Sequence, residues 1–455
     1  MCGGGHHPWL VFGLTGFILA TATSAQAQQW LSDRKRAEGS GLRVGDLEIH
    51  PGLGAEFGYT SNVYNAEKGA ELGSPELRIA PHVFLSTLSE QRTEGPDGQR
   101  TPPGMLKFKG GLSASLMHYF ADDTPGTDIG ANLDLNLTIA PDRPFSFALL
   151  ENFSRYDKPF SDPATEPGVG GVQAAPNVNY AYYTEMAGAR LLAQTRGGLL
   201  KGGLGYRFNY TFYEDDAFLT NNNLTHSVDL TGAWEFLPKT ALFYDAVYSH
   251  QDYTKNGDPG VTTNARLIDN DQLSARLGFN GAITPRISAT LAAGYAVGFF
   301  KGNDYEGVIL NAEGRWTPSE VSEWALGYER AFQSAYEGNF VLRNQIYTRL
   351  RFFFGGAFVL ASKLGVEFLD FGPDPTQMDR ARDDIRYSAD VSGEYRFVDW
   401  LAATFQLVAL IDDTDFVYEN EVPDPTPTDP DRVTTLEDPA EFKTFEAWIG
   451  LRAFY

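Results

Sequence analysis

An alternation of apolar and polar residues ends this chain, and it constrains the fold more than any other feature of the sequence. Within the last eleven residues one set of apolar side chains shares odd numbers: Phe445, Ala447, Ile449, Leu451, Ala453 and Tyr455. Glu446, Gly450 and Arg452 hold even numbers. A period of two places the two sets on opposite faces of a β-strand. One such strand suits many soluble folds, so its meaning depends on how often the pattern recurs.

The same alternation recurs upstream, and no segment of helical period interrupts the copies. In the clearest copy Ile129, Leu133 and Leu137 share one face, and Asp134 and Asn136 share the other. We predict about eighteen strands, an even number, as is typical of single-chain bacterial outer-membrane barrels. The predicted strands span residues 47–59, 77–87, 106–120, 129–139, 145–156, 180–194, 199–213, 224–236, 240–250, 272–283, 286–300, 307–316, 321–332, 340–353, 357–370, 385–397, 400–411 and 444–455.

The connections between these strands alternate in length. Short turns occur at residues 141–144, 195–198, 237–239, 284–285, 317–320, 355–356 and 398–399. Longer polar segments occur at residues 60–76, 157–179, 214–223, 253–271, 371–384 and 412–443. Short periplasmic turns and long extracellular loops are expected of this class. Residues 89–104 depart from the rule, because they fall on the short side yet are long and charged. Either they form a periplasmic docking loop, or the strand count fails near them.

Aromatic residues of the apolar parity gather near the strand ends. Near the short turns they are Phe145, Phe147, Trp234, Phe236, Trp316, Trp324, Phe352, Phe358, Tyr395, Phe397 and Tyr455. Near the long loops they are Tyr59, Phe120, Tyr210, Phe212, Phe299, Phe332, Phe368 and Phe445. Two aromatic girdles around an aliphatic band are what a lipid-facing surface needs, because these rings prefer the headgroup level. A soluble multi-domain β protein has no reason to sort its aromatics in this way.

These patterns together predict how the chain meets a membrane. No internal run of about twenty apolar residues exists, so a membrane-spanning helix is not predicted. In hydrocarbon every backbone N–H and C=O must be paired within the protein, so a membrane-spanning sheet must close on itself. We therefore predict an all-β fold, a transmembrane antiparallel up-and-down β-barrel over residues 47–455. Its expected location is the outer membrane of a Gram-negative bacterium.

The N-terminal residues are predicted to lie outside the barrel. Residues 9–24 are apolar and lead into Ala25-Gln26-Ala27, an A-x-A cleavage pattern. We predict a signal peptide over residues 1–27 and a periplasmic segment over residues 28–46. A buried N-terminal helix is the alternative, since no Lys or Arg precedes the apolar run. The only cysteine, Cys2, lies in this leader, so the mature chain is expected to lack disulfides, thiolate zinc sites and a cysteine nucleophile.

The polar parity of the strands is predicted to face the lumen of the barrel. Eighteen strands leave room for an aqueous channel unless something plugs it. The predicted pore-lining residues carry both signs of charge: Arg343, Arg349, Arg351, Arg386, Arg396, Glu313, Glu323, Glu329, Glu367, Asp390 and Glu394. They favour a pore whose transverse field orients a polar or charged permeant. The alternative is a ladder of salt bridges that stiffens the wall, and the two interpretations are compatible.

No catalytic motif is present, so we predict that the chain is not an enzyme and uses no cofactor. The histidines are scattered, and neither Gly-x-Ser-x-Gly nor His-Glu-x-x-His occurs.

Residues 412–441 form a strongly acidic segment. It holds eleven acidic residues against the single Arg432, and its prolines are expected to prevent regular structure. One hypothesis is a Ca²⁺ or Mg²⁺ site at Asp412, Asp413 and Asp415 that bridges to lipopolysaccharide phosphates. The other is a solvated acidic loop.

Two stretches near the start of the predicted barrel carry a family resemblance. They are Val44-Gly45-Asp46-Leu47-Glu48-Ile49-His50-Pro51-Gly52-Leu53 and Tyr59-Thr60-Ser61-Asn62-Val63-Tyr64. They resemble the opening of the type-2 β-barrel porins found in exopolysaccharide and capsule clusters, a style that myxobacterial surface barrels share. Thr60 stands where that family usually has Asp. The aromatic C-terminal strand likewise resembles the signal strand of outer-membrane barrels. The resemblance implies a barrel and a role with polysaccharide.

We therefore expect an outer-membrane pore, with the conduit of a polysaccharide secretion system as its specific role. The alternative is a non-conducting structural barrel that anchors a gliding-motility or adhesion complex. The expected partners are outer-membrane lipid and lipopolysaccharide, the barrel assembly machinery, and periplasmic polysaccharide-export or motility proteins. The formal net charge of −23 argues against nucleic acid as a partner, because phosphates demand a basic face.

Overall fold

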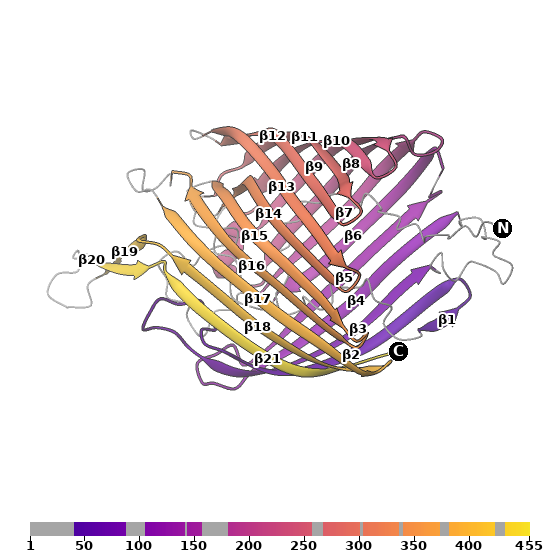
Figure 1. Cartoon of the computed structure of the whole chain (residues 1–455). Coiled ribbons are helices and arrows are strands. Elements are labelled where there is room, and N and C mark those ends of the chain that lie inside the picture. Colours follow the sequence, from indigo (N-terminus) through magenta and orange to yellow (C-terminus); the bar gives the residue numbers. More distant parts are fainter. Residues whose placement is uncertain are drawn as a thin grey trace, which may run out of the picture.

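The barrel is closed. The computed structural model describes residues 41–87, 105–141, 143–156, 181–256, 267–300, 304–335, 340–373, 382–423 and 433–455. Within these residues each strand from β2 to β18 pairs antiparallel with the next, and β21 pairs with β18 on one side and β2 on the other (Figure 1). The eighteen strands therefore satisfy one another's backbone groups around the full ring, as hydrocarbon requires.

The first nine barrel strands are β2 (Leu47–Thr60), β3 (Ser74–Thr87), β4 (Leu106–Tyr119), β5 (Thr127–Ile139), β6 (Phe145–Tyr156), β7 (Tyr182–Gln194), β8 (Leu200–Tyr213), β9 (Asn223–Leu237) and β10 (Thr240–Tyr253). The next nine are β11 (Asn270–Thr284), β12 (Ile287–Phe300), β13 (Tyr305–Ser319), β14 (Ser322–Ser334), β15 (Phe340–Phe354), β16 (Phe358–Phe371), β17 (Asp383–Val398), β18 (Leu401–Asp413) and β21 (Phe442–Phe454). The described chain also contains β1 (Leu42–Val44), the 3₁₀ helix η3 (Asp216–Asn221) and a hairpin of β19 (Val417–Pro423) and β20 (Val433–Pro439).

All eighteen predicted barrel strands are confirmed, so the strand count does not fail near residues 89–104. Those residues themselves lie outside the described part of the chain, as do residues 1–40 with the predicted signal peptide. The alternation predicts the strand positions well because one face of each strand contacts lipid and the other faces the lumen.

The acidic segment corrects one expectation, since it contains regular structure. β19 and β20 pair from Val417 with Pro439 to Pro423 with Val433. Proline is tolerated at a strand end, where it removes no interior ladder bond. Pro423 and Pro439 end their strands, and the stretch from Val417 to Val422 contains no proline. In Figure 1 the hairpin projects from the end of the barrel opposite to β1.

The first and last barrel strands close the ring at what we call the seam, the pairing of β2 with β21. It runs from Gly52 opposite Phe454 to Thr60 opposite Glu446. Residues 47–49, which precede Gly52 on β2, pair along the same edge with β1 instead of β21. Tyr455 lies between β1 and the end of β21 along this edge, and its N–H donates to the Pro51 carbonyl at 3.0 Å. The aromatic C-terminus thus lies where β1 continues the sheet.

The outer face is apolar over the middle of the strands. Its large hydrophobic side chains are exposed at alternate positions, up to 72% for Leu277 and 67% for Ile449. Most of the predicted girdle aromatics are exposed too, including Phe145, Trp234 and Phe445. Phe332 is an exception and is only partly exposed. Its ring stacks on Tyr305, with 4.2 Å between the ring centroids, beyond the end of the ladder between β13 and β14.

This exterior is that of a barrel that spans the outer membrane. In the described residues no helix is long and apolar enough to cross a bilayer.

Leu277→Arg is expected to destabilise the barrel in lipid vesicles by about 2–4 kcal/mol, because it places a charge in mid-bilayer. Leu277 sits in the middle of β11 and is the most exposed large hydrophobic residue of the outer face. Thr290→Arg on β12 is the matched control, since Thr290 has the lumen parity and is directly opposite Glu313. Urea unfolding of both variants in vesicles measures the difference. Equal losses would mean that the two faces are not sorted as described.

Candidate functional site: the lumen wall and an inward loop

The lumen face differs between two sectors of the barrel. On the seam side it is buried: every second residue from Ser74 to Phe84 on β3 and from Ala402 to Asp412 on β18 has little exposure. On β15 and β16 the same parity is more open, and Arg349 and Lys363 are exposed there. Charged side chains of the β15–β16 sector are therefore accessible from the lumen.

A buried ion pair holds the seam sector together. The guanidinium of Arg78 on β3 donates to Glu56 on β2 through Nε at 2.7 Å and also through Nη2. The other carboxylate oxygen of Glu56 accepts from the Thr404 hydroxyl of β18 at 3.0 Å. Arg78 also lies over the ring of Trp448 on β21, 4.3 Å from its centroid. One carboxylate thus ties strands on both sides of the closure.

The predicted pore-lining residues all have the lumen parity, and most of them are paired with each other. Their contacts include Arg349 with Glu313, Arg343 with Glu329 at 3.9 Å, Arg396 with Glu394 at 2.9 Å, Arg386 with Glu367 at 3.9 Å, Glu323 with Arg315 at 3.4 Å, Asp390 with Gln406 at 2.6 Å and Arg351 over the Phe353 ring at 5.4 Å. We call the lumen face of β13 to β17 the charged wall. The ion pairs of the charged wall support the interpretation that they stiffen the barrel. Its exposed side chains are compatible with a conducting pore.

The sequence interpretation omitted several lumen residues that complete these networks. Arg315 shares Glu313 with Arg349, and Arg452 on β21 donates to Glu394 on β17 at 2.7 Å. Lys363 is the exposed cation of β16. Each of these residues has the lumen parity, so the alternation alone could have found them.

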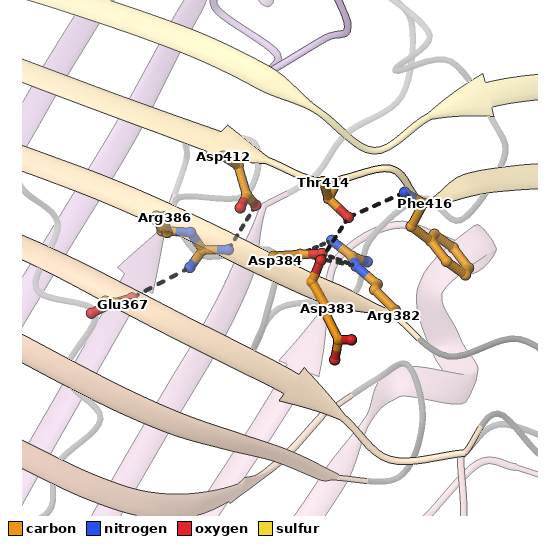
Figure 2. Close-up of polar contacts among 8 residues, drawn as sticks. All are labelled: Glu367, Arg382, Asp383, Asp384, Arg386, Asp412, Thr414 and Phe416. Atoms are coloured by element: carbon orange, nitrogen blue, oxygen red, sulfur yellow. Dashed lines mark hydrogen bonds and ion pairs between the residues drawn. The ribbon is translucent and has the colours of Figure 1, made fainter.

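Two arginines hold three carboxylates at the ends of β16, β17 and β18 nearest the long loops (Figure 2). Arg386 donates to Asp412 at 3.0 Å and lies 3.9 Å from Glu367. Arg382, just before β17, pairs with Asp384 at 2.7 Å. The side chains of Asp384 and Asp412 are fully buried, and both arginine side chains are nearly so. Since isolated buried charges are costly, the network depends on all of its members.

The same network fixes the base of the acidic segment to the barrel wall. Arg382 lies over the rings of Phe371 and Phe416, at 4.4 and 5.5 Å from their centroids. The Thr414 hydroxyl donates to the Asp383 carbonyl at 3.1 Å and accepts from the Phe416 N–H at 3.2 Å (Figure 2). The segment therefore leaves the wall in a defined direction.

The three residues of the metal hypothesis do not converge. Asp412 faces the lumen and is the partner of Arg386, whereas Asp413 follows it on the strand and faces the other way. Asp415 is exposed beyond the end of β18. Within the described residues no group of three or more His, Cys, Asp or Glu side chains is placed to hold a metal ion.

The loop after β2, residues 61–73, is tied to the start of β21. The Ser61 N–H donates to the Phe445 carbonyl at 2.9 Å, and the Phe445 N–H donates to the Ser61 hydroxyl at 2.9 Å. The buried Asn62 amide donates to the Ala66 carbonyl at 2.7 Å and to the Lys443 carbonyl at 3.3 Å. Ser61 and Asn62 of the family-like motif thus extend the seam and turn the chain.

The next two residues of the motif turn this loop into the lumen, so we call residues 61–73 the inward loop. Val63 is buried against Met117, Tyr119 and Trp448, which all have the lumen parity. Tyr64 packs against the same cluster. It also packs against a second lumen cluster of Tyr182, Tyr213 and Phe218, which belong to β7, β8 and η3. The inward loop therefore reaches from the seam to β7 and β8.

The phenol of Tyr64 is held in its neutral form. Burial, together with the negative charges of Asp128 and Asp123, raises its pKa above the ordinary value. The hydroxyl donates to the Asp123 carbonyl at 3.1 Å. Asp123 belongs to the connection between β4 and β5, so Tyr64 joins two loops as well as two clusters. This contact is expected to persist across the physiological pH range.

Comparisons with known proteins identify no family for this chain. No protein-family model and no curated protein matches the sequence. The chain is similar to the FrpB iron transporter from Neisseria meningitidis (F5-1 variant, apoprotein form), with 8% identity, a TM-score of 0.46 and coverage of 91% of this chain and 82% of that one.

It is also similar to the outer membrane protein OpdK from Pseudomonas aeruginosa, with 9% identity, a TM-score of 0.42 and coverage of 90% and 99%. A third similar structure is OccAB4 from Acinetobacter baumannii, with 11% identity, a TM-score of 0.42 and coverage of 90% of this chain and 98% of that one. These similarities are too distant to indicate what solute, if any, passes through this barrel.

Proposed function

We propose that this chain forms an outer-membrane pore that conducts polar and charged solutes through its lumen. The observation that carries the proposal is the exposure of the charged wall at its centre. The side chain of Arg349 is 46% exposed although it has the lumen parity, and Lys363 beside it is exposed as well. Water reaches these groups inside the barrel, and water-lined charged surfaces are what a permeating ion requires.

The more specific role that we propose is the outer-membrane conduit of a polysaccharide secretion system. Its support is the resemblance of the Tyr59–Tyr64 stretch to barrels of exopolysaccharide clusters, together with the contacts that Ser61, Asn62, Val63 and Tyr64 make. A strain that lacks this protein is then expected to synthesise its polysaccharide but fail to display it. Normal display in such a strain would remove this role and leave the pore intact.

The pore is tested by single-channel recording on the refolded barrel in a planar bilayer. Discrete conductance steps are expected in KCl, because the lumen carries exposed charge in the β15–β16 sector. Heat-unfolded protein at the same concentration is the control for detergent artefacts. An intact barrel, shown by its mobility in an unheated gel, that gives no steps would contradict the proposal.

The second candidate function is a non-conducting barrel that anchors a surface machine. The observation that favours it is the buried lumen face of β3 and β18, which shows that much of the interior is filled on the seam side. The fixed base of the acidic segment also suits a docking role, since it presents a hairpin in a defined direction (Figures 1 and 2). Absence of conductance with full folding would favour this candidate.

A further inference from the structure

Two cations are directly opposite each other in the centre of the charged wall. Arg349 on β15 and Lys363 on β16 are register partners in the antiparallel ladder. Both have the lumen parity, because the exposed apolar residues of the same strands, Ile346 and Leu364, have the other. Like charges in directly opposed positions destabilise a sheet. This basic pair, Arg349 and Lys363, therefore needs compensation from neighbouring carboxylates or from a ligand.

The carboxylate next to Arg349 compensates only part of this charge. Glu313 pairs with Arg349, but it also accepts from Arg315 at 3.0 Å and from the Tyr347 hydroxyl at 2.7 Å. One carboxylate thus serves two guanidinium groups. The side chain of Glu313 is only 14% exposed, whereas that of Arg349 is 46% exposed. The anion lies behind the cation, so a solute in the lumen meets the positive group.

Lys363 is compensated even less. The carboxylates that act on it are Glu367 and Asp390. Glu367 lies 3.9 Å from Arg386, and Asp390 accepts from the Gln406 amide at 2.6 Å. Among the described residues no carboxylate oxygen lies within 4.0 Å of the Lys363 ammonium. This lysine is therefore an exposed lumen cation whose neighbouring carboxylates are engaged elsewhere.

We propose that Arg349 and Lys363 form a binding site for the anionic groups of the permeant, carboxylate or phosphate. Arg349 is held in place by Glu313 and lies over the Tyr347 ring at 5.4 Å, so its planar donors are oriented before the ligand arrives. Lys363 adds a flexible point charge. Arg351, two residues along β15, adds a third positive charge. The site rests on the proposed pore only in that a solute must reach the lumen.

This proposal gives the permeant a chemical class. The whole chain carries a formal charge of −23, yet the two opposed and exposed side chains of this sector, Arg349 and Lys363, are cations. An acidic saccharide chain, with a charged group on successive units, would neutralise the opposed cations as it passes. A neutral saccharide would leave their repulsion in place and gain nothing from them.

Titration calorimetry on the refolded barrel in detergent tests the site directly. Oligogalacturonate and inorganic phosphate are the anionic probes, and a malto-oligosaccharide is the neutral control. Lys363→Gln is expected to weaken oligogalacturonate binding about tenfold, the loss of one hydrogen bond to a charged group. Lys363→Arg is expected to retain binding. Lys201→Gln, which removes a lumen cation paired with Glu235, is expected to bind like the wild type.

The outcomes separate the site from the pore. If the folded barrel binds oligogalacturonate through Lys363 but does not conduct, the anion site stands and the pore fails. If it conducts while Lys363→Gln changes neither binding nor the reversal potential in a KCl gradient, the pore stands and the anion site is overturned. Equal binding of the neutral saccharide would also overturn it. Binding of phosphate alone would assign the site to phosphate rather than to saccharide carboxylates.

Discussion

Arg78→Met is expected to lower the free energy of unfolding by about 3–5 kcal/mol, because it leaves a buried carboxylate without its cation. The side chain of Arg78 is 0% exposed and that of Glu56 is 6% exposed. After the substitution Glu56 would keep only the Thr404 hydroxyl as a described donor. Trp448 would also lose the guanidinium that covers its ring. Urea unfolding in vesicles, followed by Trp fluorescence, measures the loss.

The control separates the buried charge from the lost packing. Arg78→Met combined with Glu56→Gln removes both charges, and it is expected to recover most of the stability. Arg315→Met on β13 removes a partly exposed lumen arginine and is expected to cost less than about 1 kcal/mol. An Arg78→Met loss no larger than that of Arg315→Met would mean that the seam does not depend on this ion pair.

The sequence predicted the strands well because the determinant of each strand is local. β6 is observed over Phe145–Tyr156, which are its predicted bounds, since each of its faces meets a different solvent along its whole length. The acidic segment was less predictable. Its prolines argued against regular structure, but they leave Val417–Val422 free to pair, and the pairing partner lies across the turn.

The site was harder to predict than the strands because its contacts join distant residues. The sequence identified the arginines of β15 and β17, which cluster within short stretches. It did not identify Arg78 and Glu56, which lie on two different strands, β3 and β2. Their importance comes from the ring closing, which brings Thr404 of β18 to Glu56 of β2. Parity places a residue on the lumen face, but only the closed register says what it meets.

The direction of the inward loop was also not predictable from the sequence. The Tyr59–Tyr64 stretch was recognised by resemblance alone, which gave no role to its residues. Val63 and Tyr64 find their contacts on β4, β21 and β7, far away in the chain. No local pattern distinguishes a loop that folds inward over the lumen from one that projects outward. The packing of its two apolar residues decides the direction.

Replacing Val63 and Tyr64 together by serine is expected to raise the single-channel conductance severalfold. The double variant removes the apolar contacts that hold the inward loop across the lumen, between the seam and β7. Burying a serine in place of either side chain would cost desolvation without hydrophobic gain, so the loop is expected to leave the wall. Ser61 and Asn62 stay, and their bonds to Phe445 and Lys443 keep the seam closed. Single-channel recording and urea unfolding are measured on the same preparation.

Ala70→Ser, at the exposed part of the same loop, is the matched control and is expected to conduct like the wild type. If the double variant folds normally and its conductance stays at the wild-type level, the inward loop does not limit the pore. A silent wild type with a conducting double variant would have a different meaning. The loop would then be a plug, and the non-conducting resting barrel of the second candidate function would be the state that Val63 and Tyr64 maintain.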